Sequence, residues 1–128
     1  MQNHQKAMNN KISILHLRST LSPQSIGGAD KIIWNIAKFI DKECFSCLLC
    51  FLTKKKTRTL SSQPVQDRDV KYYVLPCRRF IDLAQLLALL KNIKKNKIKI
   101  IHSHDYKANI FGLLIKLILP QLKLGTTI

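Results

Sequence analysis

Short apolar runs alternate with amphipathic segments of helical length along this chain, and this alternation constrains the fold more than any other feature. The runs are apolar at successive positions, which is typical of strands buried on both faces of a parallel sheet. We expect strands at 11–17, 44–52, 70–76, 97–103 and 123–128. Helices are expected at 29–42, 80–95 and 106–119. The order predicts an α/β fold with a Rossmann-like, mostly parallel sheet and helices on both faces.

The apolar spacing in the helical segments predicts which side chains enter the core. Leu83, Leu87 and Leu90 form the expected core column of the second helix, and the basic stretch 53–69 is expected to be a mobile loop. Trp34 and Phe39 are expected at the margins of the first helix's core stripe. That stripe follows the helical period through Ala29, Ile32, Ile33, Ile36, Ala37 and Ile40.

Polar residues at the ends of two strands predict where a ligand would bind. In doubly wound sheets, ligands lie outside the carboxyl ends of the strands, where the winding direction changes. In the common 3-2-1-4-5 order, the first and fourth strands flank that point, and here they lead into 16–28 and 102–105. Gly27 and Gly28 directly precede the first helix, where glycine allows close backbone approach and free N–H groups face an anion.

Three interpretations of the stretch 102–105 stay open on the residues alone. His102 and His104 share a strand face and, with Asp105 and His16, offer ligands that suit zinc or iron. The same residues could contact a substrate, or simply close a strand. The metal site is the least favoured of the three, because no further cluster of His, Asp or Glu supplies supporting groups.

Two other sites are excluded by their context. Cys44, Cys47 and Cys50 have the spacing of an iron–sulfur ligand run, but their segment is apolar and strand-like, and Cys77 is far from the fourth position. We therefore expect buried free thiols. A dinucleotide site is excluded because the G-x-G-x-x-G motif is absent.

The charge is strongly basic, with 22 Lys and Arg against 7 Asp and Glu and a formal net charge of +15. Such a surface attracts anions, although an AT-rich genome would also raise the lysine content. Nucleic acid is not the expected partner, because no aromatic residues alternate with the basic runs. Residues 1–10 are expected to be a polar leader, and no run resembles a signal peptide or a membrane span. We expect a cytoplasmic protein.

The ordered set of segments ILHL, GGADKIIWNIAKFI, VLP, IHSHDYKANIFGLL and LGTTI resembles the N-terminal domain of the retaining glycosyltransferases of the GT-B fold, family 4. The resemblance covers about residues 11–128, nearly the whole chain. Its specific elements are a glycine pair followed by Ala and an acid at the first helix, and an H-x-H motif that ends a strand before a helix of small residues.

The resemblance implies one half of a GT-B enzyme, in which the N-terminal domain mainly binds the acceptor and the C-terminal domain binds a nucleotide-sugar. Gly27 and Gly28 would form the loop over the donor diphosphate, and His104 would be the catalytic histidine near the acceptor hydroxyl. His102 and Asp105 would support it. Such enzymes need no metal and no cofactor besides the donor, because backbone amides and basic side chains offset the charge of the departing diphosphate.

Two departures from the family pattern shape the functional hypothesis. Asp30 stands where Glu is commoner, and the sequence ends at Ile128, before the usual final histidine and the donor-binding domain. The resemblance thus implies a fragment or split enzyme, inactive alone, with its C-terminal domain on a separate chain. The intact enzyme would transfer a hexose to a cell-envelope glycan or lipid-linked acceptor, in peripheral contact with the anionic inner face of the membrane. The alternative is a non-catalytic, anion-binding Rossmann-like module that acts through a partner protein.

Overall fold

The computed structural model describes residues 11–19, 28–53, 65–67, 70–76 and 82–126, with side chains described outside 28–30 and 65–67. The polar leader 1–10 and Cys77 lie outside the described residues, as does most of the expected loop 53–69. Within the described ranges the elements follow in the order β1 (Ile12–Ser19), α2 (Gly28–Phe39), β2 (Phe45–Thr53), β3 (Val65–Asp67), β4 (Val70–Pro76), α3 (Leu83–Lys95), β5 (Ile100–Ser103), α4 (Tyr106–Ile118) and β6 (Lys123–Thr126).

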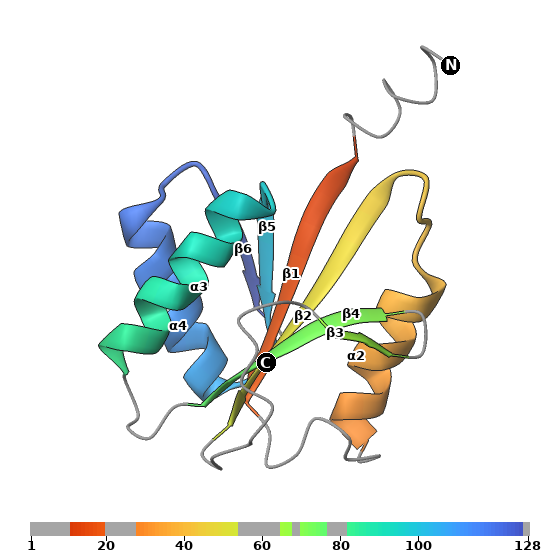
Figure 1. Ribbon diagram of the computed structural model, residues 1–128, viewed down its shortest axis with the longest axis horizontal. Coiled ribbons are helices and arrows are strands. Elements are labelled where there is room, and N and C mark those ends of the chain that lie inside the picture. Colours follow the sequence, from red (N-terminus) through yellow and green to blue (C-terminus); the bar gives the residue numbers. More distant parts are fainter. Residues whose placement is uncertain (1–10, 20–27, 54–64, 68–69, 77–81, 127–128) are drawn as a thin grey trace.

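The strands form one sheet in the order β3-β4-β2-β1-β5-β6. β1 pairs in parallel with β2 and β5, β2 pairs in parallel with β4, and β5 pairs in parallel with β6. The five expected strands therefore take the 3-2-1-4-5 order, and the Rossmann-like α/β prediction is confirmed. β1 and β5 are neighbours at the centre, where the winding direction changes (Figure 1).

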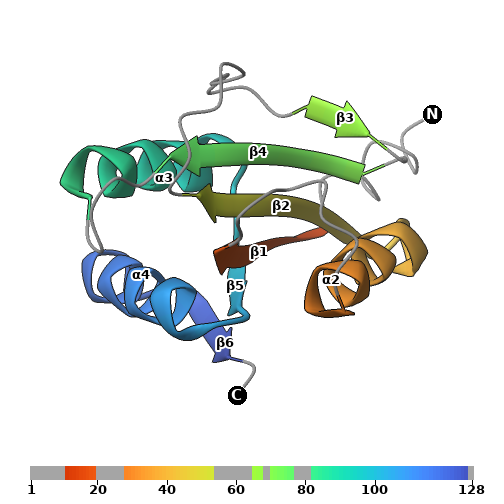
Figure 2. The same cartoon turned by 90° about the horizontal axis from the view of Figure 1, so that it is seen from below.

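Helices cover both faces of the sheet, α3 and α4 on one face and α2 on the other (Figure 2). The larger buried cluster lies under α3 and α4 and includes Leu15 and Leu17 of β1. The smaller cluster lies under α2 and includes Leu49 and Phe51 of β2. Because side chains alternate along a strand, His16 points from β1 to the α2 side. The two-sided burial explains why the strands are apolar at successive positions.

The core face of α2 differs from the expected stripe. Ile33, Trp34 and Ala37 are buried, whereas Ile32 is 60% exposed and Ile36 is also on the surface. The Trp34 ring centroid lies 5.7 Å from that of Phe51, and Tyr72 meets the indole edge-on. Burying an indole removes more apolar area from water than burying an isoleucine, so the aromatic cluster sets the rotation of the helix. α2 also ends at Phe39 rather than at 42.

The core face of α3 is rotated in the same way. Leu86, Leu89, Leu90 and Ile93 are buried, whereas the expected Leu83 and Leu87 are 67% and 59% exposed. So many leucines occur in this segment that two different stripes fit the helical period, and contact with the sheet selects one of them.

The start of α3 and the stretch before β4 also differ from expectation, whereas α3 ends at Lys95 as expected. α3 begins at Leu83, where the Asp82 carboxylate accepts hydrogen bonds from the backbone N–H groups of Ala84 and Gln85. Within the stretch expected to be a loop, Val65–Asp67 forms the edge strand β3, antiparallel to β4. Three residues are too short a run for periodicity to distinguish a strand from a loop.

Candidate functional site

The candidate site begins with the pairing of β1 and β5. His16 of β1 is in register with His102 of β5, so the two side chains leave the same face of the sheet next to each other. Their ring centroids are 5.3 Å apart. Neither strand is at an edge, since β2 flanks β1 and β6 flanks β5. The pair is therefore fixed by the hydrogen-bonding register of the central strands.

His104 follows directly after β5 and completes a cluster of three imidazoles. Its backbone N–H donates to the Leu17 carbonyl at 3.0 Å, which continues the ladder with β1. Its Nε2 lies 2.9 Å from Nδ1 of His16, a hydrogen bond in which one of the two nitrogens carries the proton. The His102 and His104 ring centroids are 4.0 Å apart. We call His16, His102 and His104 the histidine cluster.

The surroundings of the histidine cluster keep its rings neutral near pH 7. His16 is only 3% exposed, and burial, reinforced by the other two rings, lowers its pKa to about 3. Burial, with the charges of His102 and Arg18, lowers the pKa of His104 to about 4, while Asp105 acts in the opposite direction. Burial also lowers the pKa of His102. Neutral imidazoles can accept a proton, donate a hydrogen bond or coordinate a metal.

Asp105 joins the ends of β1 and α4. One carboxylate oxygen accepts from the Ala108 backbone N–H at 2.9 Å and caps α4. The other accepts from the Ser19 N–H at 2.6 Å and lies 3.8 Å from the Arg18 guanidinium. Arg18 also donates to the His104 carbonyl at 3.4 Å. The carboxylate thus holds the backbone around the histidine cluster. A supporting role for Asp105 in catalysis stays a prediction.

The glycine pair can be placed only in part. Gly28 is the first residue of α2, and Gly27 lies outside the described residues. The N-terminus of α2 lies at the same end of the sheet as the carboxyl ends of β1 and β5, where α4 also begins (Figure 1). Gly28 and His104 therefore lie at one end of the sheet. Contact with a diphosphate stays a prediction for both glycines.

The sequence points to only part of this site. It offers His16 as a possible metal ligand but not as the buried hydrogen-bond partner of His104. No motif marks Arg18, although it is the cation closest to His104 among the contacts described. Both residues lie near the carboxyl end of a central strand. Their proximity to His102 and His104 follows only once the β1–β5 register is known.

The described cysteines do not form a cluster. Cys44, Cys47 and Cys50 are thiols outside any disulfide, and within the described ranges no group that could hold a metal includes them. Cys50 is buried, as expected, and burial raises the pKa of the Cys47 thiol to about 11. Cys44 is exposed, so the prediction of buried thiols is wrong there. It lies in the turn before β2 rather than in the strand.

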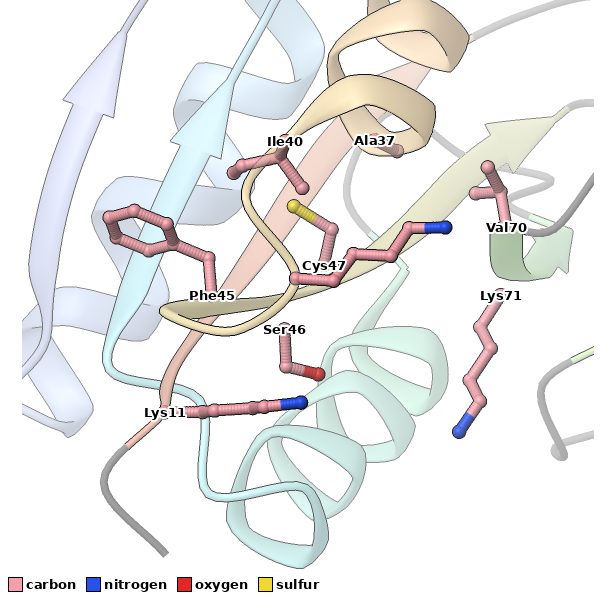
Figure 3. A pocket seen from close by; sticks show the side chains of 9 residues that line it. Lys11, Ala37, Ile40, Phe45, Ser46, Cys47, Val70 and Lys71 are labelled. Atoms are coloured by element: carbon pink, nitrogen blue, oxygen red, sulfur yellow. The ribbon is translucent and has the colours of Figure 1, made fainter. Parts of the chain in front are cut away.

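Two hollows lie at the opposite end of the sheet, by the amino ends of the strands. One, of about 270 Å³, is lined by Lys11, Lys42 and Lys71 around Ser46 and Cys47 (Figure 3). The other, of about 530 Å³, is lined by Lys97, Lys99 and Lys123 around the apolar side chains Ile98 and Leu122. Neither includes the histidine cluster. We call them the lysine-lined hollows.

No helix in the described part of the chain is long and apolar enough to cross a membrane. No family model matches the sequence, and no curated protein matches it. Among solved structures, sucrose-phosphate synthase from Thermosynechococcus elongatus is similar, with a TM-score of 0.58 and 10% sequence identity. The similarity covers 91% of this chain and 32% of that chain, so this chain spans about a third of the synthase. At this identity the comparison shows a shared Rossmann-type α/β fold and no more.

Proposed function

We propose that residues 11–128 are the acceptor-side domain of a retaining, family 4-like GT-B glycosyltransferase, and that the chain alone is inactive. The observation that carries the proposal is that the histidine cluster and the N-terminal end of α2 lie at the same end of the sheet, by the carboxyl ends of the central strands. Ligands of doubly wound sheets bind at this place. The fold shared with sucrose-phosphate synthase supports the proposal.

His104 is the proposed contact with the acceptor. A neutral imidazole can accept a hydrogen bond from a sugar hydroxyl, and burial keeps this ring neutral. His16 holds it through the 2.9 Å nitrogen–nitrogen hydrogen bond, and Asp105 and Arg18 fix the backbone beneath it. The His102 ring, 4.0 Å away between centroids, also limits the rotation of the His104 ring. The ring is therefore positioned before a ligand arrives, which reduces the cost of ordering it.

The donor is proposed to be a nucleotide-sugar whose diphosphate faces Gly27, Gly28 and the N-terminus of α2. Helix N-termini present free N–H groups and a partial positive charge to anions. During transfer of a hexose, negative charge develops on the departing diphosphate, and the protein must offset that negative charge. In the proposed assembly, most of the donor contacts come from a C-terminal domain on a separate chain, and no metal takes part in transfer.

The acceptor is proposed to be a cell-envelope glycan or lipid-linked saccharide. The net charge of +15 would bring the domain to anionic lipid at the cytoplasmic face of the membrane, where such acceptors are presented. Peripheral contact of this kind weakens as salt concentration rises.

The test is a titration of the isotopically labelled chain with a panel of glycans, lipid-linked saccharides and nucleotide-sugars, followed by amide and imidazole NMR signals. Acceptor-type ligands should shift the signals of His102, His104 and their neighbours. His104→Ala should weaken this binding at least about tenfold, the loss of a hydrogen bond of about 1.4 kcal/mol. Cys44→Ser, an exposed position outside the histidine cluster, is the control and should bind like the unaltered chain. Transfer by the purified chain alone, or no shift at the histidine cluster with any ligand, would contradict the proposal.

One observation favours the alternative, a non-catalytic anion-binding module. The lysine-lined hollows lie away from the histidine cluster and bring six lysines to the opposite end of the sheet. In that case inorganic phosphate and polyphosphate should shift signals at Lys11, Lys71 and Lys99, and no saccharide should perturb His104. The same NMR titration therefore distinguishes the two functions.

A further inference from the structure

We propose that the histidine cluster is a binding site for one transition-metal ion of the Zn²⁺ class. Each of the three side chains offers one imidazole nitrogen, and these nitrogens lie within 4.8 Å of one another. In a tetrahedral zinc site with Zn–N bonds near 2.0–2.1 Å, ligand nitrogens are about 3.3 Å apart. The 2.9 Å between His16 Nδ1 and His104 Nε2 is already near this value. A shift of up to about 1.5 Å in His102 would complete the triangle.

The backbone holds the three ligands before an ion arrives. His16 and His102 are fixed by the β1–β5 register, and His104 by its N–H bond to Leu17. Ligands on paired central strands are held more rigidly than ligands on loops. Three histidines with an open fourth position are a common zinc arrangement, and imidazole also suits Cu²⁺ and Ni²⁺.

When all three rings are neutral, metal binding neither releases nor takes up a proton. In the metal-free cluster one N–H proton lies between His16 Nδ1 and His104 Nε2. The ion takes both lone pairs, and the proton moves to the other nitrogen of the ring that carried it. If that ring is His16, the receiving nitrogen is Nε2, which is buried and has no hydrogen-bond partner among the described residues. Asp105, through its contacts at Ser19 and Arg18, is the nearest described carboxylate and partly offsets the added charge.

This ion would not be a cofactor for sugar transfer. His104 can accept from an acceptor hydroxyl at Nδ1 only while its Nε2 carries the proton shared with His16. An ion on Nε2 moves that proton to Nδ1, which then cannot accept, so metal binding and acceptor binding should exclude each other. That consequence rests on the proposed function, whereas metal binding itself does not. The site would therefore act as a metal-sensitive block on acceptor binding.

The test uses the full chain without an affinity tag, stripped with a chelator and titrated with Co²⁺ and then with competing Zn²⁺. We expect one ion per chain, visible d–d bands typical of tetrahedral Co²⁺ with nitrogen ligands, and no sulfur-to-cobalt charge-transfer band. His102→Ala and His104→Ala should each weaken binding at least about tenfold. His16→Ala should do the same, but this residue is buried, so circular dichroism must first show that the variant is folded.

The chain supplies a matched control. The Cys44→Ser/Cys47→Ser double variant should bind Co²⁺ like the unaltered chain, because neither cysteine belongs to the histidine cluster. Binding that survives both His102→Ala and His104→Ala, or that is lost in the control, would overturn the proposal, as would no binding at one equivalent. These outcomes are independent of the saccharide titration, so the failure of one proposal is distinguishable from the failure of the other.

Discussion

His16 lies within a central parallel strand, where a charged ring would be costly because burial separates it from water. The structure resolves the conflict by keeping the ring neutral and pairing its Nδ1 with His104. Unfolding returns the ring to water, where its pKa is near 6.5. The difference between the two states links the stability of the domain to pH.

We predict that the free energy of unfolding falls as the pH is lowered below about 6.5. There the unfolded chain binds protons at its histidines, whereas folded His16 and His104 stay neutral down to about pH 3 and 4. The unfolded state therefore gains more protons, and stability falls with decreasing pH by up to about 1.4 kcal/mol per unit for His16. Urea unfolding at about pH 7 and about pH 5 measures the slope.

His16→Leu is the control for that slope, since it removes the buried imidazole while leaving every carboxylate in place. The variant should lose less stability between the two pH values than the unaltered chain. Equal slopes in the two proteins would show that His16 is not the group responsible.

Asp105 provides a second prediction at this scale. Asp105→Ala should destabilise the domain by about 2–3 kcal/mol, because it removes the α4 cap and leaves the Ser19 N–H without its acceptor. Asp82→Ala removes only a cap, that of α3, and should cost about 1 kcal/mol. Denaturant unfolding of both variants compares the two losses. If Asp82→Ala lowers the free energy of unfolding as much as Asp105→Ala does, Asp105 does not stabilise the domain by joining β1 to α4.

At the scale of the elements, Gly112 determines how closely α4 packs on β5 and β6. A Cβ at this position would lie 2.9 Å from the Leu124 Cδ1 and 3.8 Å from both Ile101 and Ser103. The neighbour at 2.9 Å is the end of a side chain that can move, and alanine favours the helix by about 1 kcal/mol. Gly112→Ala should therefore change stability little.

Gly112→Leu should cost about 1–3 kcal/mol, because the extra carbons have no space between α4 and the sheet. A Cβ at Gly125 would meet no heavy atom of the described residues within 4 Å, so Gly125→Ala should stay within about 0.5 kcal/mol of the unaltered chain. Thermal unfolding of the three variants tests the series. A Gly112→Leu domain as stable as the Gly125→Ala domain would mean that α4 does not pack closely on β6.

The elements also show what the sequence could and could not predict. The central strands were predictable because burial on both faces makes them apolar throughout. The predicted strand order also placed the end of β5, with His102 and His104, next to β1. The faces of α2 and α3 were not, because Trp34 and Leu86 acquire their positions from contacts with the sheet. β3 depends on pairing with β4 rather than on its own residues. Local periodicity carries none of this tertiary information.

At the scale of the whole molecule, the dominant property is the net charge of +15. With 22 basic side chains and 7 acidic ones, most lysines and arginines cannot find a carboxylate partner, and like charges repel in the compact state. Raising the NaCl concentration from about 0.05 M to about 0.5 M shortens the screening length from above 10 Å to below 5 Å. We predict that this change stabilises the domain by about 1 kcal/mol, a rise of about 4 °C in Tm.

The choice of anion separates general screening from binding at the lysine-lined hollows. Screening depends on ionic strength alone, so dilute NaCl and phosphate solutions of matched ionic strength should raise the Tm equally. At high concentration phosphate also stabilises folded proteins because it is excluded from their surface, so the comparison uses dilute solutions. Binding at the hollows would instead give a saturable rise at low phosphate concentration, which Lys11→Ala and Lys99→Ala would reduce. A Tm that falls as NaCl is added would mean that attractive ion pairs outweigh the repulsion. In that case the basic side chains would be paired with carboxylates of the same chain rather than available to anions. The proposed docking of this surface to anionic lipid would then be contradicted as well.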